Sequence, residues 1–353
     1  MIQKFSRATK SASLRLLTLK LGQSGSFALP LLVAALLCLS YGSGFAADTN
    51  ALAKLQNVHR IVFLGDSITY AGGYVADVEA YYVTRFPKRH FEFINVGLSS
   101  ETVSGLSEAS EKNPRPDLHE RLGRVLEKTK PDLVFICYGM NDGIYSPPDE
   151  ARLKAFADGM KSVHEQIAAA GVKNIIHITP PVFDPVGAKA RLSTNDSYGF
   201  SHPYEGYNKT LDQFSDWLVA QRKVGWQVAD LHSGMSRWLG EQRQHNPNFN
   251  YTKDGVHPDG AGHWAMAKQV LLYLGANDVE KDPSPASMVA GNPHGEEILK
   301  LVREQEELLR DAWLNFCGFK RPGVKAGLPV PDAEAKSAEL DKQIRELAVS
   351  AKN

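Results

Sequence analysis

Short apolar runs alternate with longer amphipathic stretches along most of the chain. The runs, five or six residues each, predict β-strands at 60–64, 91–96, 133–138, 174–179 and 226–231. The amphipathic stretches predict helices at 75–86, 117–128, 148–170, 204–222 and 260–272. The run 133–138 is apolar enough to be a central strand of a parallel sheet. Strands that alternate with helices predict an α/β fold, in which helices cover both faces of a five-stranded parallel sheet.

Two segments depart from this alternation. Residues 182–203 form a polar insertion that contains Gly and Pro and follows the fourth strand. The end of the chain contains an amphipathic helix over 296–316, then a stretch rich in Pro and Gly over 321–331 and a charged terminal helix. The pattern therefore predicts one α/β domain over residues 58–275 and a helical C-terminal extension over residues 283–353.

The N-terminus has the order of an export signal. A basic stretch precedes the apolar run 27–39, and mostly small residues follow at 44–47. The run is shorter than the ~20 apolar residues that a spanning helix needs. We therefore expect residues 1–46 to be a signal peptide, and the mature protein to be periplasmic or extracellular with no stable membrane insertion. An uncleaved N-terminal anchor is the alternative, whereas lipidation of Cys38 is disfavoured because Leu37 precedes it where a small residue is usual.

Charge and cysteine content argue against several classes of function. The formal net charge of the whole chain is zero. Residues 1–46 hold five basic residues and no acidic one, so the remainder keeps 35 basic and 40 acidic residues, a net charge of −5. A mildly acidic body has no electrostatic reason to bind nucleic acid. The cysteines beyond the signal, Cys137 and Cys317, suggest neither a disulfide framework nor a metal cluster.

Residues with catalytic potential lie at the ends of the predicted strands. Ser67, in Gly65-Asp66-Ser67, directly follows the first strand, at the edge where ligands bind in parallel α/β sheets. Asp254 and His257 lie three residues apart in the loop before the last helix of the sheet domain. A nucleophilic serine needs a base to take its proton and a group to orient that base. We therefore predict Ser67 as nucleophile, His257 as base and Asp254 as the orienting carboxylate.

Two further strand ends offer hydrogen-bond donors. Ester hydrolysis needs donors aimed at the negative charge that develops on the carbonyl oxygen. Asn141 follows the third strand and offers its side-chain amide, and Gly97 follows the second strand and lets the backbone approach closely. We predict an oxyanion hole made of the backbone N–H groups of Ser67 and Gly97 and the amide of Asn141.

These four blocks together resemble the SGNH hydrolase superfamily, also called the GDSL lipases and esterases. The resemblance covers roughly residues 58–275. The matching blocks are Gly65-Asp66-Ser67, Gly97, Gly139-Met140-Asn141-Asp142 and Asp254-Gly255-Val256-His257. The resemblance implies a flavodoxin-like, three-layer α/β/α sandwich, the roles given above for the triad and the oxyanion hole, and neither a metal nor a cofactor.

One block departs from the family pattern. Members often carry a second glycine close after the glycine of the second block. Here Leu98-Ser99-Ser100-Glu101 intervenes before Gly105, so the resemblance leaves the geometry of this loop open.

The predicted function is hydrolysis of carboxylic esters through an acyl-enzyme. Export and an open cleft suit short-acyl esters such as acetyl groups on carbohydrate, so we expect a small-molecule or polysaccharide ester as substrate. A lysophospholipase or thioesterase of the same superfamily is the alternative and would need an apolar groove. A non-catalytic binding protein is disfavoured, because it would not need Ser67, His257 and Asn141. The chain lacks the G-x-S-x-G pattern at Ser67 and a glycine-rich phosphate motif after the first strand, which disfavours an α/β-hydrolase and nucleotide binding.

The insertion 182–203 is long for a connection in a compact domain, where ~4–6 residues are usual. It follows the fourth strand and should rise from the same edge of the sheet as the catalytic loops. Four of its residues are predicted to contact a sugar or an acyl chain: Phe183, Tyr198, Phe200 and His202. A surface loop with no contact to substrate is the alternative.

Overall fold

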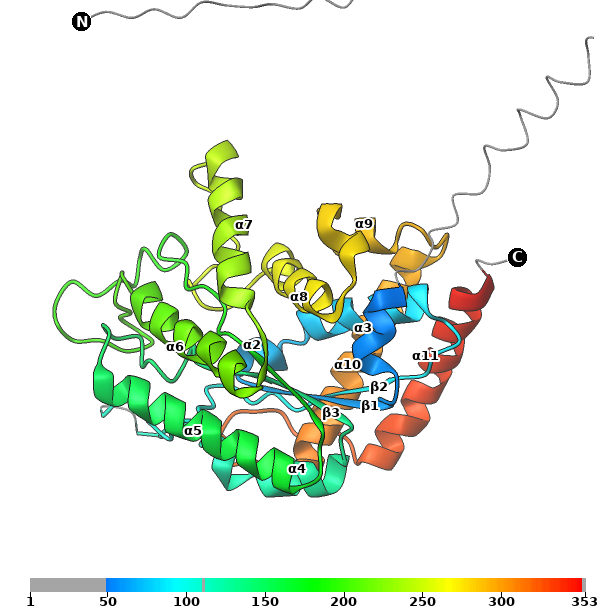
Figure 1. Cartoon of the computed structure of the whole chain (residues 1–353), viewed down its shortest axis with the longest axis horizontal. Coiled ribbons are helices and arrows are strands. Elements are labelled where there is room, and N and C mark those ends of the chain that lie inside the picture. Colours follow the sequence, from blue (N-terminus) through cyan, green and yellow to red (C-terminus); the bar gives the residue numbers. More distant parts are fainter. Residues whose placement is uncertain (1–48, 110–111, 351–353) are drawn as a thin grey trace, which may run out of the picture. The chain divides into compact units, whose positions relative to one another are not determined.

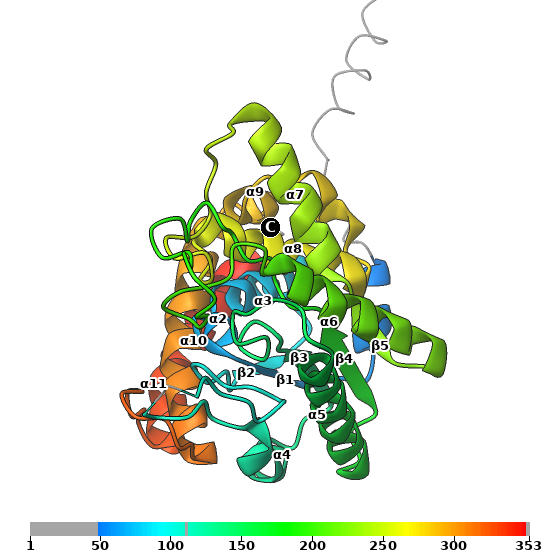
Figure 2. The same ribbon diagram turned by 90° about the vertical axis from the view of Figure 1, so that its left-hand side faces the viewer.

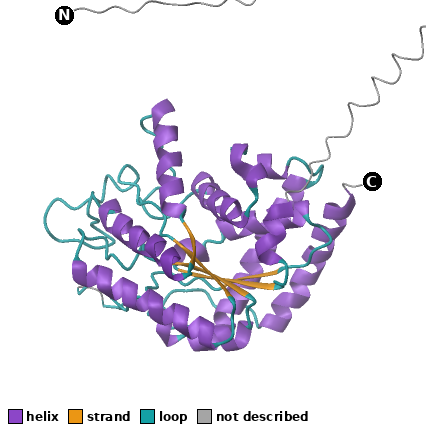
Figure 3. Cartoon of the chain, in the orientation of Figure 1, coloured by secondary structure: helices purple, strands orange, loops and turns teal. Residues whose placement is uncertain are grey.

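A five-stranded parallel sheet forms the centre of the computed structural model, which describes residues 49–109 and 112–350 (Figure 3). The predicted signal peptide over residues 1–46, with Cys38, lies outside these residues. None of the helices in the described ranges combines the length and the apolar character that crossing a membrane requires. Helices lie on both faces of the sheet, which confirms the predicted fold class (Figure 1).

The strand order is that of flavodoxin-like folds. The strands are β1 (Arg60–Gly65), β2 (Glu92–Asn95), β3 (Leu133–Cys137), β4 (Asn174–Ile178) and β5 (Gln227–Ala229). Their order across the sheet is β2-β1-β3-β4-β5, and every neighbouring pair is parallel. The order reverses between β1 and β3, which is the point where such sheets bind ligands. All residues of β3 are buried, as predicted for a central strand.

The helices form one layer on each face of the sheet, which Figure 1 and Figure 2 show from two sides. On one face lie α3 (Gly73–Arg85) and α8 (Gly260–Leu274), which pack on each other. On the other lie α4 (Leu122–Thr129) and α5 (Glu150–Ala169), with α6 (Asn208–Ala220) beside α5. The two layers of helices bury the strands on both faces of the sheet. This burial explains why the sequence of each strand is a nearly continuous apolar run.

Several elements were not predicted. The helix α7 (Leu231–His245) follows β5, and Asp230 caps it by accepting a hydrogen bond from the Ser233 N–H at 3.1 Å. Its polar composition and its two glycines hide the helical pattern. The predicted helix 117–128 is interrupted at Arg121, where a short 3-10 turn ends and α4 begins. The remaining short elements are η1 (Thr49–Leu55), η3 (Gln221–Val224), η4 (Asn277–Lys281) and α9 (Pro285–Val289).

The C-terminal extension packs on the sheet domain through a long helix. The helix α10 (Gly295–Cys317) lies along β2 and α3, and α11 (Val330–Ser350) packs against α10 (Figure 1). The predicted apolar stripe of α10 is buried at Ile298, Val302, Ala312 and Trp313. Phe316, at its end, is 46% exposed and has the Lys128 ammonium 4.4 Å from its ring centroid. The exact domain boundaries, 58–275 and 283–353, stay predictions.

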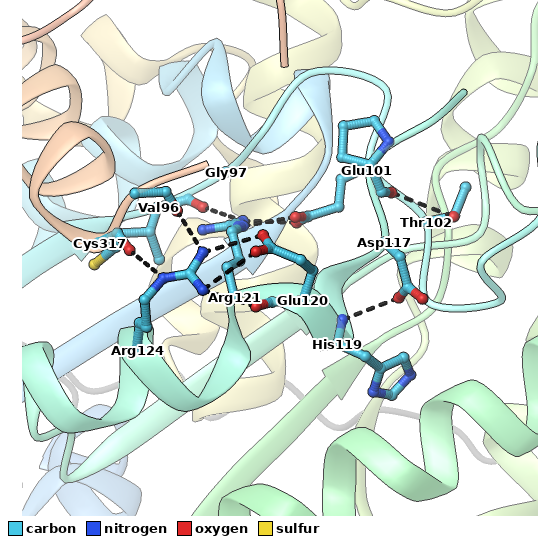
Figure 4. A network of polar contacts seen from close by, with 12 residues as sticks. Val96, Gly97, Glu101, Thr102, Asp117, His119, Glu120, Arg121, Arg124 and Cys317 are labelled. Atoms are coloured by element: carbon cyan, nitrogen blue, oxygen red, sulfur yellow. Dashed lines mark hydrogen bonds and ion pairs between the residues drawn. The ribbon is translucent and has the colours of Figure 1, made fainter. Parts of the chain in front are cut away.

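A buried ion pair supports the loop that follows β2 (Figure 4). Arg121 Nε and Nη2 each donate to the Glu101 carboxylate at 2.6 Å, and the two side chains are 1% and 0% exposed. Arg121 also donates to the Val96 carbonyl oxygen at 2.8 Å, and the Tyr138 hydroxyl donates to Glu101 at 2.5 Å. One guanidinium therefore ties the beginning of the loop, Val96, to its end, Glu101.

Loss of this guanidinium should destabilise the fold. Arg121→Leu would leave the Glu101 carboxylate buried and unpaired, so we expect the free energy of unfolding to fall by about 3–5 kcal/mol. The control is Lys154→Ala, which removes an ion pair with Asp158 whose side chains are 76% and 52% exposed. That variant should lose little free energy of unfolding, because water and salt screen an exposed ion pair. Urea unfolding followed by circular dichroism compares the two, and equal losses would contradict the assigned role of the buried pair.

Candidate active site

The strands β1 and β3 end level with each other at one edge of the sheet, and β2 ends beside them, opposite Phe63. The register pairs Phe63 of β1 with Asn95 of β2, and Gly65 of β1 with Cys137 of β3. The loops that follow these strands therefore start side by side. This is the arrangement from which parallel α/β sheets build ligand sites.

Ser67, His257 and Asp254 form one chain of hydrogen bonds. Ser67 begins α2 (Ser67–Tyr70), a short helix directly after β1. Its Oγ lies 2.8 Å from His257 Nε2, although the two residues are 190 positions apart in the sequence. His257 Nδ1 lies 2.7 Å from Asp254 Oδ2. Both distances are those at which protons transfer between positioned groups.

The Asp254 carboxylate also shapes the loop that carries it. Its Oδ1 accepts hydrogen bonds from the backbone N–H groups of Val256 and His257, both at 2.9 Å, which leaves Oδ2 for the imidazole. Gly255 has a φ of 82°, and a Cβ there would lie 2.6 Å from the Ala188 Cβ. Only glycine fits this turn without displacing the insertion, so Gly255 sets the geometry between the acid and the base.

The same contacts shift the pKa values of both side chains. Burial alone would raise the pKa of Asp254, but the hydrogen bonds from the His257 ring and backbone outweigh it and hold this pKa well below its ordinary value. Burial alone would lower the pKa of His257, but the hydrogen bond and charge of Asp254 outweigh it and raise this pKa above 6.5. Asp254 therefore stays ionised and favours a proton on Nδ1. The neutral ring then has Nε2 free to accept the Ser67 proton.

A pocket of about 390 Å³ opens over Ser67 and His257. This volume lies within the range of small-molecule sites. Nine of its eleven lining residues are polar or charged, namely Ser67, Ser99, Ser100, Glu108, Asn113, Arg115, Asn141, His257 and Arg321. The other two, Tyr145 and Phe200, are aromatic. Polar side chains therefore surround Ser67 and His257, with two aromatic rings beside them.

Asn141 lies in this pocket with its amide held by four hydrogen bonds. Its Oδ1 accepts from Arg115 Nη1 and from the Tyr145 hydroxyl, both at 2.9 Å. Because two donors hold the oxygen, Nδ2 is turned toward Asp66 Oδ2 at 3.2 Å and the Glu101 carbonyl oxygen at 3.3 Å. Both Nδ2 contacts are at the long end for an N–H···O bond, so an incoming acceptor can compete for these two hydrogens.

Asp66 connects Asn141 to the helix that begins with Ser67. Its Oδ1 accepts from the Ile68 N–H at 2.9 Å and so caps α2. The side chain is 3% exposed, and burial raises its pKa to about 7. Asp66 thus links the first turn of α2 to the loop after β3.

Gly97 is the predicted oxyanion donor that the structure does not bring to the pocket. Its N–H donates to Asn95 Oδ1 at 2.9 Å, and it does not line the pocket. Glycine is required there for another reason: a Cβ would lie 2.4 Å from the Tyr70 backbone nitrogen, so α2 leaves no room for a side chain. Ser100 lines the pocket instead, with a φ of 67°, and its N–H has no hydrogen-bond partner among the described residues.

Phe200 is the one residue of the insertion's four predicted contacts that lines the pocket. Its ring centroid lies 6.2 Å from that of His257 and 5.4 Å from that of Tyr145, both edge to face. Its backbone N–H donates to Glu108 at 3.3 Å. The insertion therefore contributes Phe200 alone to the lining of the pocket.

The other three predicted contacts do not line this pocket. Phe183 is fully buried, and its N–H and carbonyl pair with the side chain of Asn208 at 2.8 and 2.7 Å, which fixes it in the core. Tyr198 packs edge to face on Tyr204, 5.6 Å between ring centroids, outside the pocket lining. His202 is exposed and also lies outside the lining.

Asp142 follows Asn141 and has a structural role. Its carboxylate accepts hydrogen bonds from the backbone N–H groups of Gly139, Val103 and Ser104 at 3.0, 2.9 and 2.9 Å. It therefore joins the loop after β3 to the loop after β2. Across residues 49–109 and 112–350, no group of His, Cys, Asp and Glu side chains is arranged to hold a metal ion.

Seven residues of the pocket were not predicted: Ser99, Ser100, Glu108, Asn113, Arg115, Tyr145 and Arg321. Glu108 and Arg115 form a nearly buried ion pair at 2.6 Å, in a long connection without hydrophobic periodicity. Arg321 lies in the Pro- and Gly-rich stretch after α10, far from every motif. One feature of the sequence pointed to any of these residues: in the second family block, Ser99 and Ser100 stand where members of the family often have a second glycine.

Comparison with known proteins identifies a family. The model of the GDSL-like lipase/acylhydrolase family matches residues 63–265, more than half of the chain. No curated protein matches the sequence. The match contains each of the four blocks that carry the resemblance described above, from Gly65-Asp66-Ser67 to Asp254-Gly255-Val256-His257.

Solved structures are similar in fold and distant in sequence. BT4096, a gut microbial diltiazem-metabolizing enzyme, has a TM-score of 0.50 and 22% identity over 62% of this chain and 47% of its own. This chain therefore spans about half the length of BT4096. A carbohydrate acetylesterase family member from Sinorhizobium meliloti has a TM-score of 0.43 and 15% identity, over 62% and 99% of the two chains. The psychrotrophic esterase EstA from Pseudoalteromonas has a TM-score of 0.38 and 16% identity, over 62% and 97%.

The contact between Asp254 and His257 predicts a specific titration. The carboxylate stabilises the imidazolium, so the ring proton resonances of His257 should titrate with a midpoint above 6.5. In Asp254→Asn the charge is gone and burial remains, so the midpoint should fall below that of the wild type. NMR titration of both proteins, with His257→Gln to assign the resonance, measures the difference. A midpoint that stays the same in Asp254→Asn would contradict the coupling.

Proposed function

The chain belongs to the GDSL-like lipase/acylhydrolase family, whose members hydrolyse ester bonds, and on this basis we propose that Ser67 carries the acyl group during hydrolysis of a carboxylic ester. The observation that carries the proposal is the 2.8 Å contact between Ser67 Oγ and His257 Nε2, at the floor of a polar pocket. Family membership supports ester hydrolysis in general, and this contact supports the roles of individual residues.

Acyl transfer to Ser67 needs one proton to move twice. His257 Nε2 takes the hydroxyl proton while Ser67 Oγ bonds to the carbonyl carbon of the ester. Asp254 accepts from Nδ1–H and stabilises the imidazolium that forms. Nε2 then gives its proton to the leaving oxygen as the C–O bond breaks, which releases the alcohol. A water molecule repeats the sequence: His257 takes its proton, the oxygen attacks the acyl carbon, and the proton returns to Ser67 as the acid leaves.

The oxyanion hole that we propose differs from the sequence prediction in one donor. Its donors are the N–H groups of Ser67 and Ser100 and the Nδ2 amide of Asn141. Ser100 replaces Gly97 because it lines the pocket and its N–H has no acceptor among the residues that the structure describes, while the Gly97 N–H donates to Asn95. The left-handed φ of Ser100 is uncommon for a residue with a Cβ, and the buried Arg121–Glu101 pair beside it supplies a rigid support.

The polar lining favours a small acyl group on a polar alcohol, such as an acetyl group on carbohydrate. A lysophospholipase or thioesterase would need an apolar groove for an acyl chain. The pocket offers Tyr145 and Phe200 as its aromatic residues, and the rest of the lining is polar or charged. We further propose that the protein acts outside the cytoplasm, on the ground of the signal-like residues 1–46.

The proposal predicts that ester hydrolysis depends on the Ser67 hydroxyl. Ser67→Ala should lower kcat on p-nitrophenyl acetate by about 10⁴-fold or more, because the nucleophile is lost while the donors remain. Ser162→Ala, which removes a hydroxyl on α5 far from the pocket lining, should keep wild-type activity. Steady-state kinetics on both purified variants tests this. Activity within tenfold of the wild type in Ser67→Ala would refute the assignment of the nucleophile.

A further inference from the structure

Arg321 reaches the pocket from the C-terminal extension. It lies between α10 and α11, outside the part of the chain that the family model matches. Its Nη2 donates to Ser100 Oγ at 2.9 Å, and it lines the same pocket as Ser67 and His257. The extension therefore adds a cationic group to a site that the sheet domain otherwise builds.

The charge of Arg321 has no partner in the pocket. Arg115, the other arginine of the lining, donates to the Glu108 carboxylate at 2.6 and 2.8 Å, and both side chains are less than 10% exposed. Burial alone would raise the pKa of Glu108, but Arg115 outweighs it and holds this pKa below its ordinary value, so the pair is neutral as a whole. Within the described residues, Arg321 has no carboxylate at ion-pair distance and donates only to the neutral Ser100 hydroxyl. Its remaining N–H donors are available to a ligand.

The backbone before Arg321 is fixed to the sheet domain. Arg124, on α4, donates to the carbonyl oxygens of Cys317 and Gly318 at 3.0 and 3.3 Å (Figure 4). Lys128, one turn further along α4, donates to the Phe316 carbonyl oxygen at 2.6 Å. These bonds satisfy carbonyl groups at the end of α10 that the helix itself leaves open. The segment that carries Arg321 is thus held at a defined place beside the pocket, which lowers the entropy cost of binding through it.

We propose that Arg321 binds an oxyanionic group of the substrate, a carboxylate or a phosphate, beside the ester that Ser67 attacks. The inference rests on the proposed function and narrows its substrate class, from esters in general to esters whose alcohol or acyl part carries an acid. A planar guanidinium matches both groups through paired N–H···O bonds. It also offsets the repulsion between that anion and the negative charge that develops on the carbonyl oxygen during attack.

A purely supporting role for Arg321 makes a different prediction. Its hydrogen bond to Ser100 would help to hold the loop whose N–H we assign to the oxyanion hole. Loss of such support would lower kcat for charged and neutral esters by the same factor. Loss of an anion-binding group would instead raise KM for charged esters and change the ratio between the two kinds of ester.

The test compares matched substrates in matched variants. The substrates are 4-acetoxybenzoate, 4-acetoxyphenyl phosphate and the neutral methyl 4-acetoxybenzoate, together with a succinyl monoester and its methyl ester for an acid on the acyl side. The variants are Arg321→Gln, Arg321→Lys and the control Lys325→Gln, which removes an exposed charge of the same segment that does not line the pocket. Because each ratio is taken relative to the wild type, intrinsic differences in substrate reactivity cancel.

In Arg321→Gln we expect the ratio of kcat/KM for an anionic ester to that for its neutral partner to fall about tenfold or more, mainly through KM. Arg321→Lys should restore part of the ratio, Lys325→Gln should leave it unchanged, and added salt should reduce the wild-type ratio. The charged substrate whose ratio falls shows whether Arg321 binds a carboxylate or a phosphate. It also shows whether that group lies on the acyl side or on the alcohol side of the ester.

Two results would overturn the inference, and they are distinguishable. If the wild type hydrolyses both charged and neutral esters but Arg321→Gln leaves every ratio unchanged, Arg321 does not bind an anion and the proposed ester hydrolysis stands. If the wild type hydrolyses none of these esters, the proposed function fails, and the inference fails with it.

Discussion

The four hydrogen bonds of the Asn141 amide hold together the segments that follow β1, β2 and β3. Through Nδ2 the amide contacts Asp66 and the backbone of Glu101, and through Oδ1 it contacts Arg115 and Tyr145. Arg115 is in turn paired with Glu108, whose carboxylate also accepts from the backbone of the insertion at Phe200. One polar network therefore runs from Asp66, which caps α2, to Phe200 of the insertion. Because buried networks of this kind are costly to leave partly satisfied, the loops keep one relative arrangement.

The C-terminal extension supports the same site from the opposite side. Glu306 of α10 accepts a hydrogen bond from Asn95, the last residue of β2, at 2.6 Å, and burial raises the pKa of this carboxyl to about 7. Arg310 donates to the Tyr70 carbonyl oxygen at 3.0 Å, and its guanidinium lies 4.3 Å from the Tyr70 ring centroid. Tyr70 is the last residue of α2, which begins with Ser67. The extension therefore supports the helix that begins with Ser67 as well as supplying Arg321.

The sequence predicts those parts of the molecule that depend on local pattern. The apolar runs predicted the five strands. Because parallel strands end at one edge of a sheet, the sequence also predicted that Ser67, Asn141 and the Asp254–His257 loop lie close together. Gly97 was assigned a wrong contact because a glycine indicates close approach without naming the neighbour, which is the backbone of α2.

What the sequence could not predict depends on contacts between distant segments. The backbone conformation of Ser100 is supported by the buried pair of Arg121 and Glu101, and neither has a recognisable motif. Arg321 is brought to the pocket by the packing of α10 on α4 and β2, which no periodicity in its own segment reveals. Such residues are found only when the packing of the whole chain is known.

The proposed mechanism requires that one serine, Ser67, is activated by His257 and forms the covalent intermediate. Peptide mass spectrometry after reaction with an organophosphonate tests this requirement, because the reagent mimics the tetrahedral intermediate and stays on the nucleophile. We expect one phosphonyl group per chain, located on Ser67, and much slower labelling in His257→Ala. A label on any other residue, or no label on a protein that still hydrolyses esters, would contradict it.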